Sequence, residues 1–358
     1  MYFCRVEAIT VCLLFVYGAV FSWLSIPRVA QIVRKYKIYR KPSKRDLHWR
    51  LVPKLTGIVF YAAFLVISFA FVSYTEPRRL ILLLCAGAVI VYVGIRDDIF
   101  ELSPWAKLLL QLVAISFFVF GENLVVWNLN GFLGIYELPV YVAYFLTYFV
   151  GVFMINAFNL CDGIDGFAGL MGVVISFCYA IIFYIIEDFL FMAYCIVLMG
   201  LLTGFLRYNL SFKKKVFMGD TGSLFLGFIF YLFTMYFVTD QSVILDGFLP
   251  KKSLVYVASM CLFILPIIDS GSVFFFRALR KKNPFAADNN HLHHLALRYA
   301  KSHIKASLLL VGGLVFIIFV FARLSFTIPP NSTIALFFGL LLFLFVVVAI
   351  LRRVPKNL

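Results

Sequence analysis

Runs of about 20 mainly apolar residues recur along almost the whole chain, and they restrict its fold more than any other feature. Such a run is typical of a helix that crosses the hydrocarbon core of a bilayer, where every backbone polar group must be satisfied within the helix. Only 14% of the 358 residues are charged, whereas a soluble domain has about 25%. We therefore expect an all-α polytopic membrane protein, folded as a single integral membrane domain over residues 1–358. Its eleven predicted spans start near residues 4, 53, 80, 104, 139, 166, 189, 220, 253, 306 and 333.

The basic residues predict the orientation of these spans. The net charge is +15, and most Lys and Arg side chains fall in alternate loops, which lie on one side of the membrane. Cytoplasmic loops carry such an excess. We therefore expect the N-terminus outside, and the C-terminus and polar loops in the cytoplasm. This distribution favours contact with lipid headgroups over nucleic-acid binding.

Two further patterns concern the loops and the cysteines. The stretch 121–138 alternates apolar and polar residues around Asn130-Gly131, which predicts a small external β-hairpin. The seven cysteines have neither CxxC nor Cys/His ligand spacing, so the sequence predicts neither a disulfide framework nor a zinc site.

Carboxylates gather at the predicted cytoplasmic ends of the spans. Asp97 and Asp98 end the third span; such a pair can bind a divalent cation or supply a base, and a solvated helix end is the alternative. The stretch 156–166 is rich in Asn, Asp and Gly, which supply hard oxygen ligands and tight turns, so we favour function over a plain turn. Its polar residues of interest are Asn156, Asn159, Asp162 and Asp165.

Two later segments carry groups suited to phosphate. The segment 217–223 opens the eighth span, where small residues can expose backbone N–H groups to phosphate oxygens and Asp220 can hold a cation; a simple N-cap is the alternative. The segment 277–294 combines a basic stretch with three histidines, and we favour phosphate binding there over zinc. We expect catalytic loops near 96–107, 156–166, 213–223 and 277–305.

Together and in this order, these segments resemble the bacterial polyprenyl-phosphate N-acetylhexosamine-1-phosphate transferases, glycosyltransferase family 4, in the undecaprenyl-phosphate GlcNAc-1-phosphate branch. The phospho-MurNAc-pentapeptide translocase is a relative. The resemblance covers residues 53–294. The residues that carry it are Asp97-Asp98, NAFNLCDGIDG (156–166), FMGDTGS (217–223) and HLHH (291–294).

The resemblance implies ten or eleven membrane helices, Mg²⁺ or Mn²⁺, a UDP-activated N-acetylhexosamine donor and undecaprenyl phosphate as acceptor. UMP would be released, and cell-wall or surface polysaccharide synthesis (teichoic acid or lipopolysaccharide O-antigen) initiated at the bacterial inner membrane. A homodimer is compatible with it. One departure is Thr56-Gly57, where the family commonly has Gly-Gly.

The resemblance also implies roles for single residues. Catalytic groups are Asp97, Asp98 and Asp162, and metal ligands are Asp220 and Asp162. Substrate-binding residues are Asn156, Asn159, Asp165, Phe217, Gly219, Ser223, Arg277, His291, His293 and His294.

Alternatives remain open for both function and mechanism. A polytopic transporter would place its ionisable groups near the middle of the spans, and Asp269 is the acid that best suits such a role. A lipid phosphatase would need no nucleotide. For a transferase, direct displacement with Asp97 or Asp98 as base competes with a two-step route through a carboxyl-phosphate.

Overall fold

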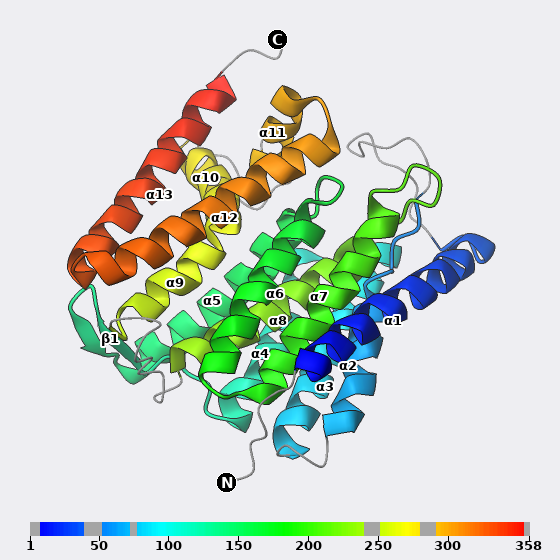
Figure 1. Ribbon diagram of the computed structural model, residues 1–358, viewed down its shortest axis with the longest axis horizontal. Coiled ribbons are helices and arrows are strands. Elements are labelled where there is room, and N and C mark those ends of the chain that lie inside the picture. The colour runs from blue at the N-terminus through cyan, green and yellow to red at the C-terminus, as the bar shows by residue number, and fades with distance from the viewer. Residues whose placement is uncertain (1–7, 39–51, 72–76, 240–250, 280–290, 354–358) are drawn as a thin grey trace. The chain divides into compact units, whose positions relative to one another are not determined.

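The computed structural model describes residues 8–38, 52–71, 77–239, 251–279 and 291–353 (Figure 1). Residues 280–290 of the predicted loop 277–305 and residues 39–51 of the first basic loop lie outside the described ranges. The first seven helices are α1 (Ala8–Lys35), α2 (Ile58–Phe71), α3 (Pro77–Phe100), α4 (Pro104–Gly121), α5 (Val140–Leu160), α6 (Phe167–Ile185) and α7 (Phe189–Asn209). The others are α8 (Gly219–Thr239), α9 (Leu254–Leu262), α10 (Ile264–Leu279), α11 (Leu292–Ala300), α12 (His303–Thr327) and α13 (Pro330–Arg353), and the strands are β1 (Asn128–Phe132) and β2 (Ile135–Glu137).

The apolar runs form helices, as predicted, and the all-α polytopic fold is confirmed. Within the described ranges, nine helices are long and apolar enough to cross a membrane, and the bent pair α9 and α10 makes a tenth span if it is counted as one. The remaining predicted run, the second in the chain, corresponds to α2, which has only 14 described residues. A straight span needs about 20, so the described part of α2 is too short to cross alone.

The predicted ninth span is not continuous. Helix α9 ends at Leu262, α10 starts at Ile264, and their axes differ by 78°. Pro266 explains the break, because it has no N–H to donate and its ring clashes with the carbonyl four residues earlier in a continuing helix.

The predicted hairpin is present as β1 and β2, which pair antiparallel, but its turn is not where the sequence suggested. Phe132 pairs with Ile135, so Leu133 and Gly134 form the turn, and both have positive φ as a type I′ turn requires. Asn130 and Gly131 also have positive φ and coincide with a shift in register inside β1. The Asn-Gly pair therefore marks a bulge.

The chain forms two compact units. The first comprises Met1–Val125, Thr147–Asn159 and Gly169–Phe233, and so contains α1–α4, α7 and most of α5, α6 and α8. The second comprises Val126–Leu146, Leu160–Ala168 and Thr234–Leu358, and so contains the hairpin, the 161–166 turn and α9–α13. That the whole chain is one functional domain stays a prediction.

The first unit packs around α8, the most buried of the candidate spans. Helix α1 runs along α7, and α3 lies against α4 (Figure 1). An aromatic cluster fills the interior, with Phe233 in edge contact with Phe183 and Phe191, and Phe64 stacked on Tyr194. This packing fixes the positions of the helix ends.

Candidate active site

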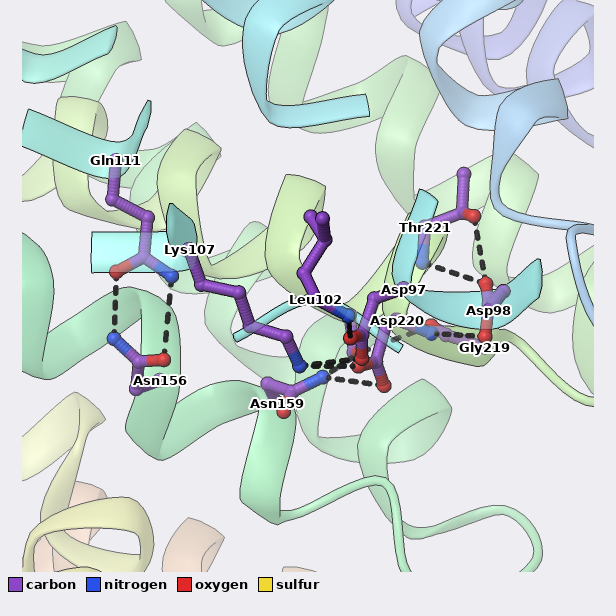
Figure 2. A network of polar contacts seen from close by, with 11 residues as sticks. Asp97, Asp98, Leu102, Lys107, Gln111, Asn156, Asn159, Gly219, Asp220 and Thr221 are labelled. Carbon is purple, nitrogen blue, oxygen red and sulfur yellow. Dashed lines mark hydrogen bonds and ion pairs between the residues drawn. The ribbon is translucent and has the colours of Figure 1, made fainter. Parts of the chain in front are cut away.

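Four helix ends in the first unit bring polar side chains together (Figure 2). Asp97 and Asp98 lie in the last turn of α3, and Lys107 in the first turn of α4. Asn159 lies in the last turn of α5, and Asp220 is the second residue of α8. Carboxylates from two of the predicted loops therefore meet in one network.

Lys107 joins two of the acids. Its Nζ forms an ion pair with Asp97 Oδ2 and lies 3.4 Å from Asp220 Oδ2. The other oxygen of Asp97 accepts a hydrogen bond from Leu102 N at 2.8 Å, within the short turn between α3 and α4. The Lys107 and Asp220 side chains are 26% and 32% exposed, so a ligand can reach them. Lys107 was not among the predicted site residues, because it stands alone between apolar residues and matches none of the motifs.

Asp98 serves the start of α8. Its Oδ1 accepts from Asp220 N at 3.1 Å, and its Oδ2 accepts from Thr221 N at 3.0 Å and Thr221 Oγ1 at 2.7 Å. The first N–H groups of a helix have no partner within the helix, so Asp98 caps α8 from a distant helix. Gly219 is required here, because its φ is +73° and a Cβ would meet the Asp98 carboxylate.

Asn159 and Ser223 position the side chain of Asp220. Asn159 Nδ2 donates to Asp220 Oδ1 at 3.1 Å and to Ser223 Oγ at 2.7 Å. Ser223 Oγ donates in turn to Gly219 O at 2.9 Å. The network thus includes three of the predicted substrate-binding residues, Asn159, Gly219 and Ser223, which form hydrogen bonds with one another.

Asn156 pairs with a residue that the sequence analysis missed. Its Nδ2 donates to Gln111 Oε1 at 2.7 Å, and Gln111 Nε2 donates back to Asn156 Oδ1 at 3.3 Å. Gln111 is 1% exposed, one turn beyond Lys107 on α4. This amide pair fastens α4 to α5 beside the network, and a signal for it was the polar Gln within an apolar run.

The segment before α2 is hydrogen-bonded to Phe217, in the segment that leads into α8. Phe217 N donates to Pro53 O at 2.9 Å, and Thr56 Oγ1 donates to Phe217 O at 2.7 Å. The Thr in place of the family's common Gly therefore adds a hydrogen bond. Gly57 packs directly on the backbone of Gly222, where a Cβ would not fit.

The second unit contains a separate cluster around Asp269 of α10. Asp269 Oδ1 lies 3.1 Å from His291 Nδ1, and Oδ2 lies 3.1 Å from His293 Nδ1. Asp269 is 1%, His291 7% and His293 2% exposed. His294 is less buried than the other two histidines of the motif.

The 161–166 turn belongs to this second unit. Asp162 is partly exposed on it, and Asp165 is buried and contacts His303, with 3.4 Å between Asp165 Oδ2 and His303 Nδ1. Cys161 is fully buried at the start of the turn, and this burial raises the pKa of its thiol well above the usual value. Arg277 lies in the last turn of α10, and its role in binding stays a prediction.

The network in the first unit suits a divalent cation that is held in part by substrate. Within the described ranges, His, Cys, Asp and Glu side chains form no group of three arranged as a metal site. Mg²⁺ often has only one or two carboxylate ligands, and phosphate oxygens and waters complete its shell. Asp97 and Asp220, which already attract the Lys107 ammonium, fit such a site.

Comparisons with known proteins point to one family. Residues 80–238 match the model of the family described as glycosyl transferase family 4. An undecaprenyl-phosphate alpha-N-acetylglucosaminyl 1-phosphate transferase of Escherichia coli O157:H7 is 30% identical over 325 residues, which cover 88% of this chain and 85% of that relative. A probable undecaprenyl-phosphate N-acetylglucosaminyl 1-phosphate transferase of Bacillus subtilis (strain 168) is 30% identical, covering 77% and 74%. A relative from Yersinia pestis with the same name as the Escherichia coli protein is 29% identical, covering 90% and 87%.

Proposed function

The chain belongs to glycosyl transferase family 4, and on this premise we propose that it transfers a sugar-1-phosphate, N-acetylglucosamine-1-phosphate first of all, from a UDP-sugar to undecaprenyl phosphate. The products are undecaprenyl-diphospho-sugar and UMP. The names of the relatives support the acceptor and the sugar. The product would initiate a cell-wall or surface polysaccharide such as teichoic acid or O-antigen.

One observation carries the proposal beyond the names of the relatives. Three helix ends place Asp97, Lys107 and Asp220 in a single partly exposed network. A transporter would need such groups near the middle of its spans, whereas these lie at helix ends. An enzyme whose lipid substrate has its phosphate at the membrane surface needs them there.

The main chemical requirement of this transfer is to neutralise the negative charges of the lipid phosphate and the donor diphosphate. An anionic lipid phosphate must attack the sugar-linked phosphorus of an anionic diphosphate, and UMP leaves with the electrons of the broken P–O bond. A cation and a lysine in a site of this kind stabilise that charge. We assign the role of this lysine to Lys107, whose ammonium group lies between the carboxylates of Asp97 and Asp220.

We propose Mg²⁺ or Mn²⁺ as the metal, held by Asp220 with Asp97. When bound, the ion would neutralise diphosphate oxygens as a Lewis acid. Asp162, the other predicted ligand, lies on the turn of the second unit, and its role stays a prediction. We further propose that Asp97 binds the lipid phosphate or accepts its proton. Asp98 would keep Asp220 in position by capping the start of α8.

A transfer assay tests the proposal. Purified protein in detergent is incubated with undecaprenyl phosphate, Mg²⁺ and radiolabelled UDP-N-acetylhexosamines, and organic-soluble label and UMP are measured. Equal amounts of labelled lipid and UMP, both abolished by EDTA and by Asp220→Ala, are expected. A Ser211→Ala variant, changed outside the network, is the control. UMP release without labelled lipid would contradict transfer, and a folded protein inactive with every donor would reject the proposal.

Orientation and assembly complete the proposal. We propose a multi-pass protein of the bacterial cytoplasmic membrane, with the N-terminus outside and the network inside, which the distribution of Lys and Arg supports. A homodimer is compatible with this arrangement. Labelling of a Ser211→Cys variant in sealed inside-out and right-side-out vesicles tests the orientation, because residue 211 should react from the cytoplasmic side alone.

A further inference from the structure

One buried carboxylate, Asp269, organises the histidine motif of the second unit. Its Oδ1 faces His291 Nδ1 and also accepts from Leu292 N at 2.6 Å, while its Oδ2 faces His293 Nδ1. An ionised carboxylate only accepts hydrogen bonds. Each imidazole must therefore present Nδ1–H to Asp269, which fixes the orientation of both rings.

The far edge of the His293 ring supports the acidic turn. A Cβ added at Gly163 would come closer to Nε2, Cδ2 and Cε1 of His293 than real Cβ atoms approach any neighbour. The ring has little room to retreat, because His293 is 2% exposed and packs beside Phe167, with 6.2 Å between ring centroids. The backbone of the turn therefore rests on the ring at Gly163, the residue next to Asp162.

The other end of the turn is fixed from α12. Asp165 N donates to His303 Nδ1 at 3.3 Å, and Ser307 Oγ donates to Asp165 O at 2.8 Å. The segment between these two anchors, residues 163–165, directly follows Asp162. Its geometry thus depends on residues of the chain more than 100 positions later.

We propose that Asp269 is a positioning residue, which holds His293 against Gly163 and so fixes the backbone that carries Asp162. His293 then acts on the protein and not on the substrate, unlike the role taken from the family resemblance. Its burial supports this, since a ring 2% exposed presents almost no surface to a ligand. The inference rests on the proposed function only in that Asp162 is one of the predicted catalytic groups.

A double-mutant cycle between Gly163 and His293 tests the contact. Gly163→Ala should lower kcat by about tenfold or more, because a displaced backbone misplaces the groups that it carries. In a His293→Ala background, where the ring is absent, Gly163→Ala should lower kcat by less than about threefold further. The midpoint of thermal unfolding should follow the same pattern, which gives the cycle a second measurement that does not depend on enzymatic activity. Gly312→Ala is the control, because a Cβ there meets nothing within 4 Å. Equal effects of Gly163→Ala in both backgrounds would overturn the proposal.

Histidine nitrogen NMR tests the carboxylate directly. With ¹⁵N-labelled histidine, two of the five side chains should show the Nδ1–H form, and Asp269→Asn should remove or shift these signals while a His48→Gln control keeps them. Their absence in protein that transfers normally overturns the positioning role. Their presence, with a non-additive thermal cycle, in protein that transfers no sugar phosphate would uphold that role and reject the proposed function instead.

Discussion

The cap that Asp98 forms on α8 gives the sharpest prediction about this protein. Asp98 is 7% exposed and accepts three hydrogen bonds, two from backbone N–H groups of α8 and one from the Thr221 hydroxyl. We predict that Asp98→Ala and Thr221→Val both destabilise the protein and reduce turnover, because the start of α8 carries Asp220.

The expected magnitudes follow from counting donors. A hydrogen bond to a charged group contributes about 1.5–3 kcal/mol, so Thr221→Val, which removes one of the three and keeps the volume, should cost about that much. Asp98→Ala leaves all three donors without a partner, at about 1–3 kcal/mol each, and should cost about 3–6 kcal/mol because such losses are not fully additive.

The assay combines thermal unfolding in detergent, followed by intrinsic tryptophan fluorescence, with initial rates of lipid labelling below the midpoint. Asp97→Asn is the matched comparison, because it weakens the pair with Lys107 and leaves the α8 cap intact. It should lower the rate with a smaller change in stability than Asp98→Ala. Full stability of Asp98→Ala without activity, together with normal turnover of Thr221→Val, would refute the cap and make Asp98 a base.

Three further predictions concern Lys107, Gln111 and Cys161. Lys107→Met should lower kcat by about tenfold or more. It should also increase the thermal stabilisation by added Mg²⁺, because the ammonium that competes for the carboxylates is gone. An unchanged rate would show that Lys107 takes no part in the chemistry. Gln111→Leu should cost about 1–3 kcal/mol of thermal stability, because the Asn156 amide loses its buried partner, with unchanged KM for the UDP-sugar; a raised KM at full stability would mean that this pair binds substrate instead. Cys161→Ser should keep activity within about threefold. Because burial raises the pKa of the Cys161 thiol, alkylation at this position in folded protein should be slow at neutral pH and accelerate only well above pH 9, the ordinary range for thiols; rapid labelling at pH 7 would contradict the burial.

Hydropathy predicted most of the helices because lipid demands a long apolar run wherever the chain crosses. It did not predict the break at Phe263, although Pro266 was a visible local signal. The Asn130-Gly131 pair misled because positive φ suits both a turn and a bulge, and the paired strands decide between them.

The candidate site divides along a similar line. The motifs contained Asp97, Asn159 and Asp220, whose residue types already suit a cation and phosphate. Nothing local showed that Lys107 joins two of these acids, because the contact with Asp220 spans 113 positions. The use of Asp98 as a cap was equally hidden, since a carboxylate at one helix end and free N–H groups at another become partners only through tertiary packing.

The distance along the chain between Asp98 and the helix that it caps has a consequence for synthesis in the cell. The two partners are 122 residues apart, and ribosomes add about 5–20 residues per second. For roughly 6–24 seconds the nascent chain therefore has α3 complete and its carboxylates without α8. An insertion machinery that shelters these acids from the bilayer during that interval, or faster elongation that shortens it, would determine the yield of active protein.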